Sequence, residues 1–151
     1  MKPSQMLFAA ALVAFGATGA HAATPPPDDL SYFTVPTEQN TRNLDAIMKG
    51  YANALKSDNP GVVGSALAHV AYIAIWMPQA RLSEVKERVQ ELARTGSTPT
   101  MQFRAYLVNM ALDSPRLFAH LRTTNFSDDE EFYAALSRTL QVTLLGYWKA
   151  E

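Results

Sequence analysis

Histidine is the first residue type to consider for chemistry in this chain, because a neutral imidazole binds metals and transfers protons near neutral pH. The sequence holds three, His21, His69 and His120. No pair has the H-x-x-x-H or H-E-x-x-H spacing that places two imidazoles around zinc on one helix face. A haem ligand would need an apolar pocket around one of them, and nothing in the sequence selects one. We therefore interpret His69, which has apolar neighbours, as a buried or rim histidine.

Four consecutive carboxylates, Asp128–Glu131, are the second candidate for chemistry. A calcium loop spaces its ligands alternately around a glycine, and this run lacks that pattern. The run follows Ser127, in the order expected for a capping box, and acidic residues stabilise the first turn of a helix by about 0.3–1 kcal/mol each. The carboxylates therefore indicate a helix start, and no metal is expected.

Nucleophilic catalysis has no recognisable motif here. The chain lacks G-x-S-x-G, S-x-x-K and a glycine-rich phosphate loop. It has no cysteine, which removes thiol nucleophiles, thiolate metal sites and disulfides together. The sequence thus predicts a protein that is not an enzyme and has no cofactor, with an enzyme of unrecognised site kept as a third hypothesis. The formal net charge of −1 argues against a nucleic-acid partner.

The first 23 residues have the layout of a secretory signal peptide. Lys2 precedes an apolar run from Met6 to about Ala17, and Ala20-His21-Ala22 forms an A-x-A cleavage site. The run is shorter than the roughly 20 residues that span a bilayer. We expect cleavage near Ala23 or Thr24, a periplasmic or secreted mature protein, and no stable membrane insertion afterwards.

Three prolines, Pro25–Pro27, then predict an extended linker over residues 24–36. The length and the 48% hydrophobic content suit one domain, expected over residues 37–151. Apolar residues recur there at three- and four-residue steps, and sustained alternation is absent. The sequence predicts six helices: one opened by Thr37, then Pro60 to about Met77, Ser83 to Gly96, Pro99–Leu112, a short one from Pro115, and a last one after Ser127.

An internal repeat organises the first four helices. A shift of about 39 residues places Asn59-Pro60 on Thr98-Pro99, so each unit is an amphipathic helix followed by a more apolar one. The junction Leu55–Leu67 resembles the corresponding junction of HEAT-like repeats, and the resemblance covers residues 41–113. Val63 and Gly64 stand where that pattern has aspartate and arginine, and two units are fewer than solenoids usually need. The resemblance implies a short helical-repeat protein.

Both second helices are apolar on the side that an open solenoid leaves wet, where Tyr72, Ile75 and Trp76 lie. Large apolar side chains gain roughly 1.5–3 kcal/mol each on burial, so this stripe must be covered. The predicted fold is all-α: two HEAT-like helical hairpins closed by a long C-terminal helix. The closing line of that helix is Phe132, Leu136, Leu140, Leu144 and Trp148. A second subunit or a partner is the alternative cover.

The predicted function is a non-catalytic secreted or periplasmic scaffold that binds another protein or itself. The alternative is a binder of a small apolar ligand or lipid, held in a cavity formed by Tyr72, Trp76, Met77, Tyr106 and Met110. The candidate binding residues are Tyr72, Trp76, Gln102, Arg104, Tyr106 and Asn109. Among these, the polar stripe of Gln102, Arg104 and Asn109 is the first target for mutation.

Overall fold

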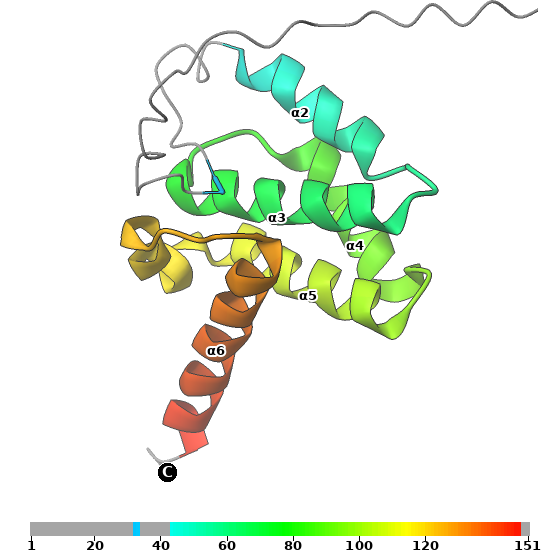
Figure 1. Cartoon of the computed structure of the whole chain (residues 1–151). Coiled ribbons are helices and arrows are strands. Elements are labelled where there is room, and N and C mark those ends of the chain that lie inside the picture. Colours follow the sequence, from blue (N-terminus) through cyan, green and yellow to red (C-terminus); the bar gives the residue numbers. More distant parts are fainter. Residues whose placement is uncertain (1–31, 34–42, 149–151) are drawn as a thin grey trace, which may run out of the picture.

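The computed structural model describes residues 32–33 and 43–148. Within these ranges the chain is helical and contains no strand, which confirms the all-α prediction. The elements are α2 (Leu44–Ala54), α3 (Pro60–Trp76), α4 (Ser83–Thr95), α5 (Pro99–Asp113), the 3-10 helix η1 (Pro115–Thr123) and α6 (Asp129–Trp148), as Figure 1 shows. In this described part of the protein, no helix combines the length and the apolar character needed to cross a membrane.

The two apolar helices, α3 and α5, begin in the same way. At α3 the Asn59 side chain accepts a hydrogen bond from the Gly61 amide at 2.9 Å, and Pro60 occupies the first position. At α5 the Thr98 hydroxyl accepts one from the Met101 amide at 3.1 Å, and Pro99 comes first. A proline there loses no helical hydrogen bond, and the cap satisfies a free amide. The predicted starts of both helices are confirmed.

The start of α6 differs from the predicted capping box by one residue. Asp128, rather than Ser127, accepts the hydrogen bond from the Glu131 amide, at 2.8 Å. The Glu131 carboxylate in turn accepts from the Ser127 amide at 2.8 Å and from its hydroxyl at 2.9 Å. The predicted cap at Ser127 and the observed cap at Asp128 are the same kind of reciprocal cap, shifted by one residue. The sequence allows both, because a carboxylate follows three residues after each of them. The carboxylates of this run serve the helix start, as predicted.

The N-terminal boundary of the packed domain also differs from the prediction. Helix α2 begins at Leu44, and Thr37, the expected cap, lies outside the described residues. Phe33, placed by the sequence in a linker over 24–36, is fully buried in the core. The Tyr32 amide donates to the Phe126 carbonyl at 2.7 Å. This part of the expected linker therefore belongs to the domain, because an aromatic ring gains much free energy when it leaves water.

Helices α3 and α5 form the centre of the molecule. The most extensive packing is between α4 and α5 and between α3 and α5, while α2 lies against α3 and α4. Helix η1 packs on α3 and α5, and the Arg122 guanidinium donates to the Ile75 carbonyl near the end of α3 at 2.7 Å. The two consecutive helix pairs, α2–α3 and α4–α5, thus share one core.

Helix α3 is buried on nearly every side, as its composition predicts. Its stripe around Tyr72 is covered by three aromatic residues from three different segments. Phe33 stacks on Tyr72 with ring centroids 4.4 Å apart, and Phe132 meets Phe33 edge-on at 4.8 Å. Phe126, in the loop before α6, lies 5.1 Å from Phe132. The cover is therefore shared between the N-terminal segment, this loop and the first turn of α6.

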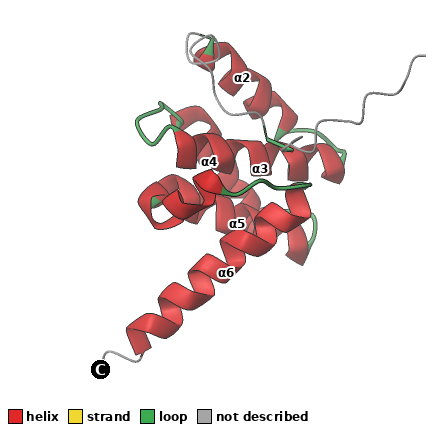
Figure 2. Cartoon of the chain, turned by 60° about the vertical axis from the view of Figure 1, so that its left-hand side comes forward, coloured by secondary structure: helices red, strands yellow, loops and turns green. Residues whose placement is uncertain are grey.

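Among the described side chains of α6, the last buried one is Leu140. Phe132 and Leu136 are fully buried and Leu140 is 8% exposed, whereas Leu144 is 57% exposed. The predicted line of covering residues is therefore wrong beyond Leu140, and the side chain of Trp148 lies outside the described residues. Figures 1 and 2 show the reason, since the C-terminal end of α6 points away from the other helices.

Candidate functional site

Tyr72 and Trp76, two of the predicted binding residues, lie on the inner helix α3. Tyr72 is buried beneath Phe33 and 6.1 Å from Phe132. Its burial raises the pKa of the phenol, and the Trp76 indole acts in the opposite direction. Trp76 is partly buried at a centroid distance of 6.0 Å from Tyr72. Tyr72 therefore belongs to the core, and Trp76 packs against the core at a partly buried position.

In the polar stripe on α5, Gln102 and Arg104 bond to neighbouring segments, whereas Asn109 bonds to a residue of α5 itself. The Gln102 side-chain amide donates to the Gly96 carbonyl at 3.0 Å and so holds the turn between α4 and α5. The turn is tight, because a Cβ atom on Gly96 would lie 2.6 Å from the Leu92 carbonyl oxygen. The Asn109 amide donates to Asp113 at 3.1 Å, and Asp113 pairs with Lys86 of α4 at 2.6 Å.

Arg104 joins α5 to the start of α6. Its guanidinium forms an ion pair with Glu130 and lies 4.8 Å from the centre of the Tyr133 ring. The Tyr133 hydroxyl, in turn, donates to the Gly64 carbonyl of α3 at 2.7 Å. Burial is the main cause that raises the pKa of Tyr133 far above its ordinary value of 10. Arg104 therefore belongs to a network that holds three helices together.

Tyr106 is the predicted binding residue that the structure leaves largely free. It is 48% exposed, and Phe103, three residues earlier on the same helix, is 51% exposed. Residues three apart are neighbours on a helix surface, so the two rings form one aromatic surface on the outer side of α5. The prediction missed Phe103 because an aromatic residue in an apolar helix is normally assigned to the core. We call Phe103 and Tyr106 the α5 aromatic face.

His69 lies at the edge of a surface hollow of about 520 Å³ between α2 and the start of α3. Its Nδ1 is 2.9 Å from the Ser65 carbonyl oxygen, and its ring lies 5.8 Å from Tyr51 and 5.4 Å from Tyr32. The Ser65 hydroxyl is 2.8 Å from the Tyr32 hydroxyl, so serine and histidine do not form a nucleophile–base pair. Burial, assisted by Tyr32, raises the pKa of Tyr51. The interpretation of His69 as a rim histidine agrees with this geometry.

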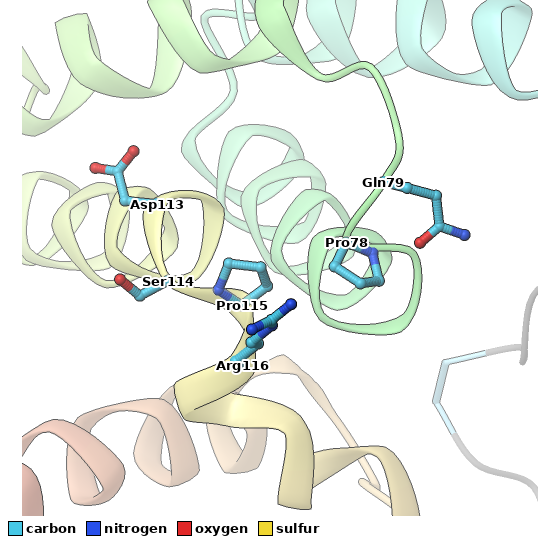
Figure 3. A pocket seen from close by; sticks show the side chains of 6 residues that line it. All are labelled: Pro78, Gln79, Asp113, Ser114, Pro115 and Arg116. Atoms are coloured by element: carbon cyan, nitrogen blue, oxygen red, sulfur yellow. The ribbon is translucent and has the colours of Figure 1, made fainter.

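A second hollow, of about 590 Å³, lies between the loop after α3 and the junction of α5 with η1. Figure 3 shows its lining, with Arg116 beside Pro78 and Pro115 and the Asp113 carboxylate pointing away from Arg116. Asp113 is already held by Lys86 and Asn109. The hollow thus brings together the Arg116 guanidinium and the rings of Pro78 and Pro115.

The carboxylates and histidines of the described ranges do not gather into a metal site, since no group of three or more such side chains lies close enough to hold an ion. Glu130 pairs with Arg104, while Asp128 and Glu131 cap α6. His120 Nε2 lies 3.3 Å from the Thr139 hydroxyl, on the contact between η1 and α6. Each of these side chains therefore interacts with a neighbouring residue of the fold.

The five residues of the predicted apolar cavity differ in their exposure within the described part of the chain. Tyr72 is buried under Phe33, whereas Tyr106 faces outward on α5. Four hollows that lie among described residues, of about 590, 520, 380 and 200 Å³, have other lining residues. The binding of a small apolar ligand by these five residues stays a prediction.

Comparison of the chain with known protein families, curated proteins and solved structures finds no match. The resemblance to HEAT-like repeats thus remains a sequence-based interpretation, and the function must be argued from the surface of this chain alone.

Proposed function

We propose that this protein is a non-catalytic helical scaffold that binds another protein through the α5 aromatic face. The observation that supports it is the exposure of Phe103 and Tyr106, one turn apart on a helix whose other apolar side chains, such as Leu107 and Val108, pack into the core. Tyrosine and other aromatic side chains dominate the energetics of protein interfaces, because they remove a large area from water at a small entropy cost.

The rigidity of α5 supports the same function. Gln102 holds one end of the helix to the α4–α5 turn, and Arg104 joins it to α6. A partner that contacts Phe103 and Tyr106 would meet a helix already fixed in place, so little ordering would accompany binding. In this proposal the predicted stripe of Gln102, Arg104 and Asn109 acts as support for the aromatic face.

We further propose that α2–α3 and α4–α5 are two HEAT-like units. Two features support this, the shared cap-and-proline start of α3 and α5 and the packing of these two helices against each other. Stacked helix pairs expose one surface of each unit, and repeat proteins of this kind use such surfaces for binding. The α5 aromatic face would lie on the second unit.

Export is part of the proposal, because residues 1–23 have the pattern of a signal peptide. The experiment is N-terminal sequencing and intact-mass measurement of the protein recovered from its native cells. We expect a mature chain that starts near Ala23 or Thr24. An intact Met1 on protein recovered from the cytoplasmic fraction would contradict export without affecting the binding proposal.

The binding test uses a photo-crosslinking amino acid at position 103 in the native cells, with position 90 on the exposed side of α4 as the control site. We expect a discrete crosslinked protein from position 103 and not from position 90. With the captured protein purified, Tyr106→Ala should weaken binding at least about tenfold, whereas Val62→Ala, at an exposed site on α3, should not.

Two outcomes would count against this function. Equal crosslinking from both positions would show that the α5 aromatic face has no specific partner. A lipid or other apolar molecule retained by the mature protein in native mass spectrometry, with binding unaffected by Tyr106→Ala, would favour the small-ligand alternative.

A further inference from the structure

His69, on α3, is held by aromatic side chains from two other segments. The centre of its imidazole ring is 5.0 Å from that of Phe33, 5.4 Å from that of Tyr32 and 5.8 Å from that of Tyr51. Phe33 and Tyr32 belong to the N-terminal segment, whereas Tyr51 belongs to α2. These contacts fix the orientation of the imidazole, so a ligand would meet a group that is already in place.

The contact of His69 with the main chain determines which ring nitrogen carries the proton. Nδ1 is 2.9 Å from the Ser65 carbonyl oxygen. A carbonyl oxygen can only accept a hydrogen bond, so Nδ1 is the donor and the neutral imidazole has its lone pair on Nε2. Nε2 has no hydrogen-bond partner among the described residues and is not enclosed by them. His69 therefore offers an accessible acceptor that the fold does not use.

The hollow that His69 lines has room for a small, largely apolar ring. Its volume of about 520 Å³ is within the roughly 300–1,000 Å³ of known ligand pockets. Its apolar lining includes Ala54, Ala66 and Val62, and Val62 is 43% exposed. The two alanines leave space next to the stacked rings of Tyr51 and His69. A mostly apolar lining with few polar groups is typical of a small-molecule site.

We propose that this hollow binds an aromatic ring that carries an N–H donor, of which indole is the simplest form. The apolar body of the ring packs on Ala54, Ala66 and Val62, and its N–H donates to His69 Nε2. A carboxylate does not fit the neutral imidazole, because it has no hydrogen to donate to the lone pair. A purely apolar molecule would remove Nε2 from water without giving it a partner, which costs free energy.

The indole site is independent of the proposed binding of another protein. Its lining residues belong to α2, α3 and the turn between them, and none of them belongs to α5. Either proposal can therefore fail while the other holds. Binding of so small a ring should be weak, with a dissociation constant of about 0.1–1 mM, because few atoms leave water.

The test is a titration of the mature protein with indole, followed by heteronuclear NMR of the backbone amides. We expect the largest shift changes at Ala54, Val62, Ser65 and His69, which line the hollow. N-methylindole is the matched control ligand, because it has the same ring system without the N–H. It should bind at least about threefold more weakly, through the loss of one hydrogen bond.

Two pairs of variants test the residues of the site. His69→Phe keeps an aromatic ring but removes the acceptor, so it should bind indole and N-methylindole equally, whereas His120→Phe, outside the hollow, should keep the wild-type preference. Ala54→Leu tests the space without altering His69. It should weaken indole binding at least about fivefold, whereas Asn53→Leu, at the exposed position before it, should not. Thermal midpoints show that each variant is folded.

N-acetyltryptophanamide distinguishes two sources of such a ring. If it binds as well as indole and shifts the same amides, the site accepts a tryptophan side chain of a polypeptide. If only indole binds, the site takes a free small molecule.

Three outcomes would overturn the proposal. The first is the absence of shift changes at these amides up to the solubility limit of indole. The second is equal binding of indole and N-methylindole by the wild type, or a preference that His69→Phe leaves unchanged. The third is a set of shift changes centred on Phe103 and Tyr106, which would place the ring on the α5 aromatic face instead.

Discussion

Phe33 shows how much a single side chain contributes to this core. Its ring contacts Tyr72, Phe126 and Phe132, which come from α3, the loop before α6, and α6 itself. Its partners are therefore far away in sequence. The proline-rich segment that precedes Phe33 does not indicate this packing. Removal of the ring would open a cavity at the point where these segments meet.

We expect Phe33→Ala to lower the free energy of unfolding by about 3–5 kcal/mol, because it removes a fully buried aromatic ring. Phe103→Ala is the matched control at a half-exposed position and should change it by less than about 1 kcal/mol. Urea unfolding followed by circular dichroism measures both. Equal effects of the two substitutions would mean that Phe33 does not belong to the folded domain.

Tyr133 makes the free energy of unfolding depend on pH in the alkaline range. Burial raises the pKa of its phenol above the unfolded value of about 10, and Asp129 and Glu130 act in the same direction while Arg104 opposes them. The folded state therefore keeps a proton that the unfolded state loses. The resulting stability is complete below pH 10 and declines as the pH rises above it, by up to about 1.4 kcal/mol per pH unit.

Tyr133→Phe removes this titration together with the hydrogen bond to Gly64. At pH 7 we expect a loss of about 1 kcal/mol in unfolding free energy. Between pH 10 and 11 the decline should be shallower than in the wild type, but not absent, because the pKa values of Tyr51 and Tyr72 are also raised. Urea midpoints measured at pH 7, 10 and 11 test this. An unchanged slope would refute the assignment to Tyr133.

At the scale of the helices, the starts of α3 and α5 depend on contacts within four residues of sequence. Asn59 caps α3 through the Gly61 and Val62 amides, at 2.9 and 3.4 Å. Thr98 has the same role at α5. Such caps determine where a helix begins because the first amides of a helix have no partner within it.

Asn59→Ala should therefore reduce the unfolding free energy by about 1 kcal/mol, through the loss of the cap. Asn53→Ala, at an exposed position inside α2, is the control and should be neutral or slightly stabilising, because alanine favours a helix interior. Thermal unfolding of the two variants gives the comparison. A cap variant as stable as the control would show that Pro60 alone is sufficient to start α3.

At the scale of the whole molecule, the two halves of α6 have different roles. The part up to Leu140 supplies Phe132, Tyr133, Leu136 and Leu140 to the core, and Glu130 to the ion pair with Arg104. The second half contributes exposed residues. The function of α6 as a cover for the helix pairs thus depends on about three turns of the helix.

Two deletions separate these roles. Deletion of 127–151 removes four buried side chains and exposes Phe33 and Tyr72, so we expect loss of cooperative thermal unfolding. Deletion of 141–151 should leave a cooperatively folded domain with a near-native near-ultraviolet spectrum. If the larger deletion remained folded and monomeric, the covering role of α6 would be wrong.

The features that the sequence by itself determined depend on interactions between residues close together in the chain. The helical class, the starts of α3 and α5, and the burial of α3 follow from caps, prolines and apolar spacing within a few residues. The carboxylates at the start of α6 were recognised on the same ground, although the cap shifted by one residue.

Only the tertiary structure decided the role of each candidate site residue. Arg104 meets Glu130, Tyr133 meets Gly64, and Phe33 meets Tyr72, and these pairs are far apart along the chain. Periodicity shows that a side chain faces inward or outward, but it does not show which distant segment lies opposite. The structure therefore uses Gln102 and Arg104 to join neighbouring segments, and it leaves Phe103 and Tyr106 exposed. The packing of whole helices determines which apolar surfaces are covered.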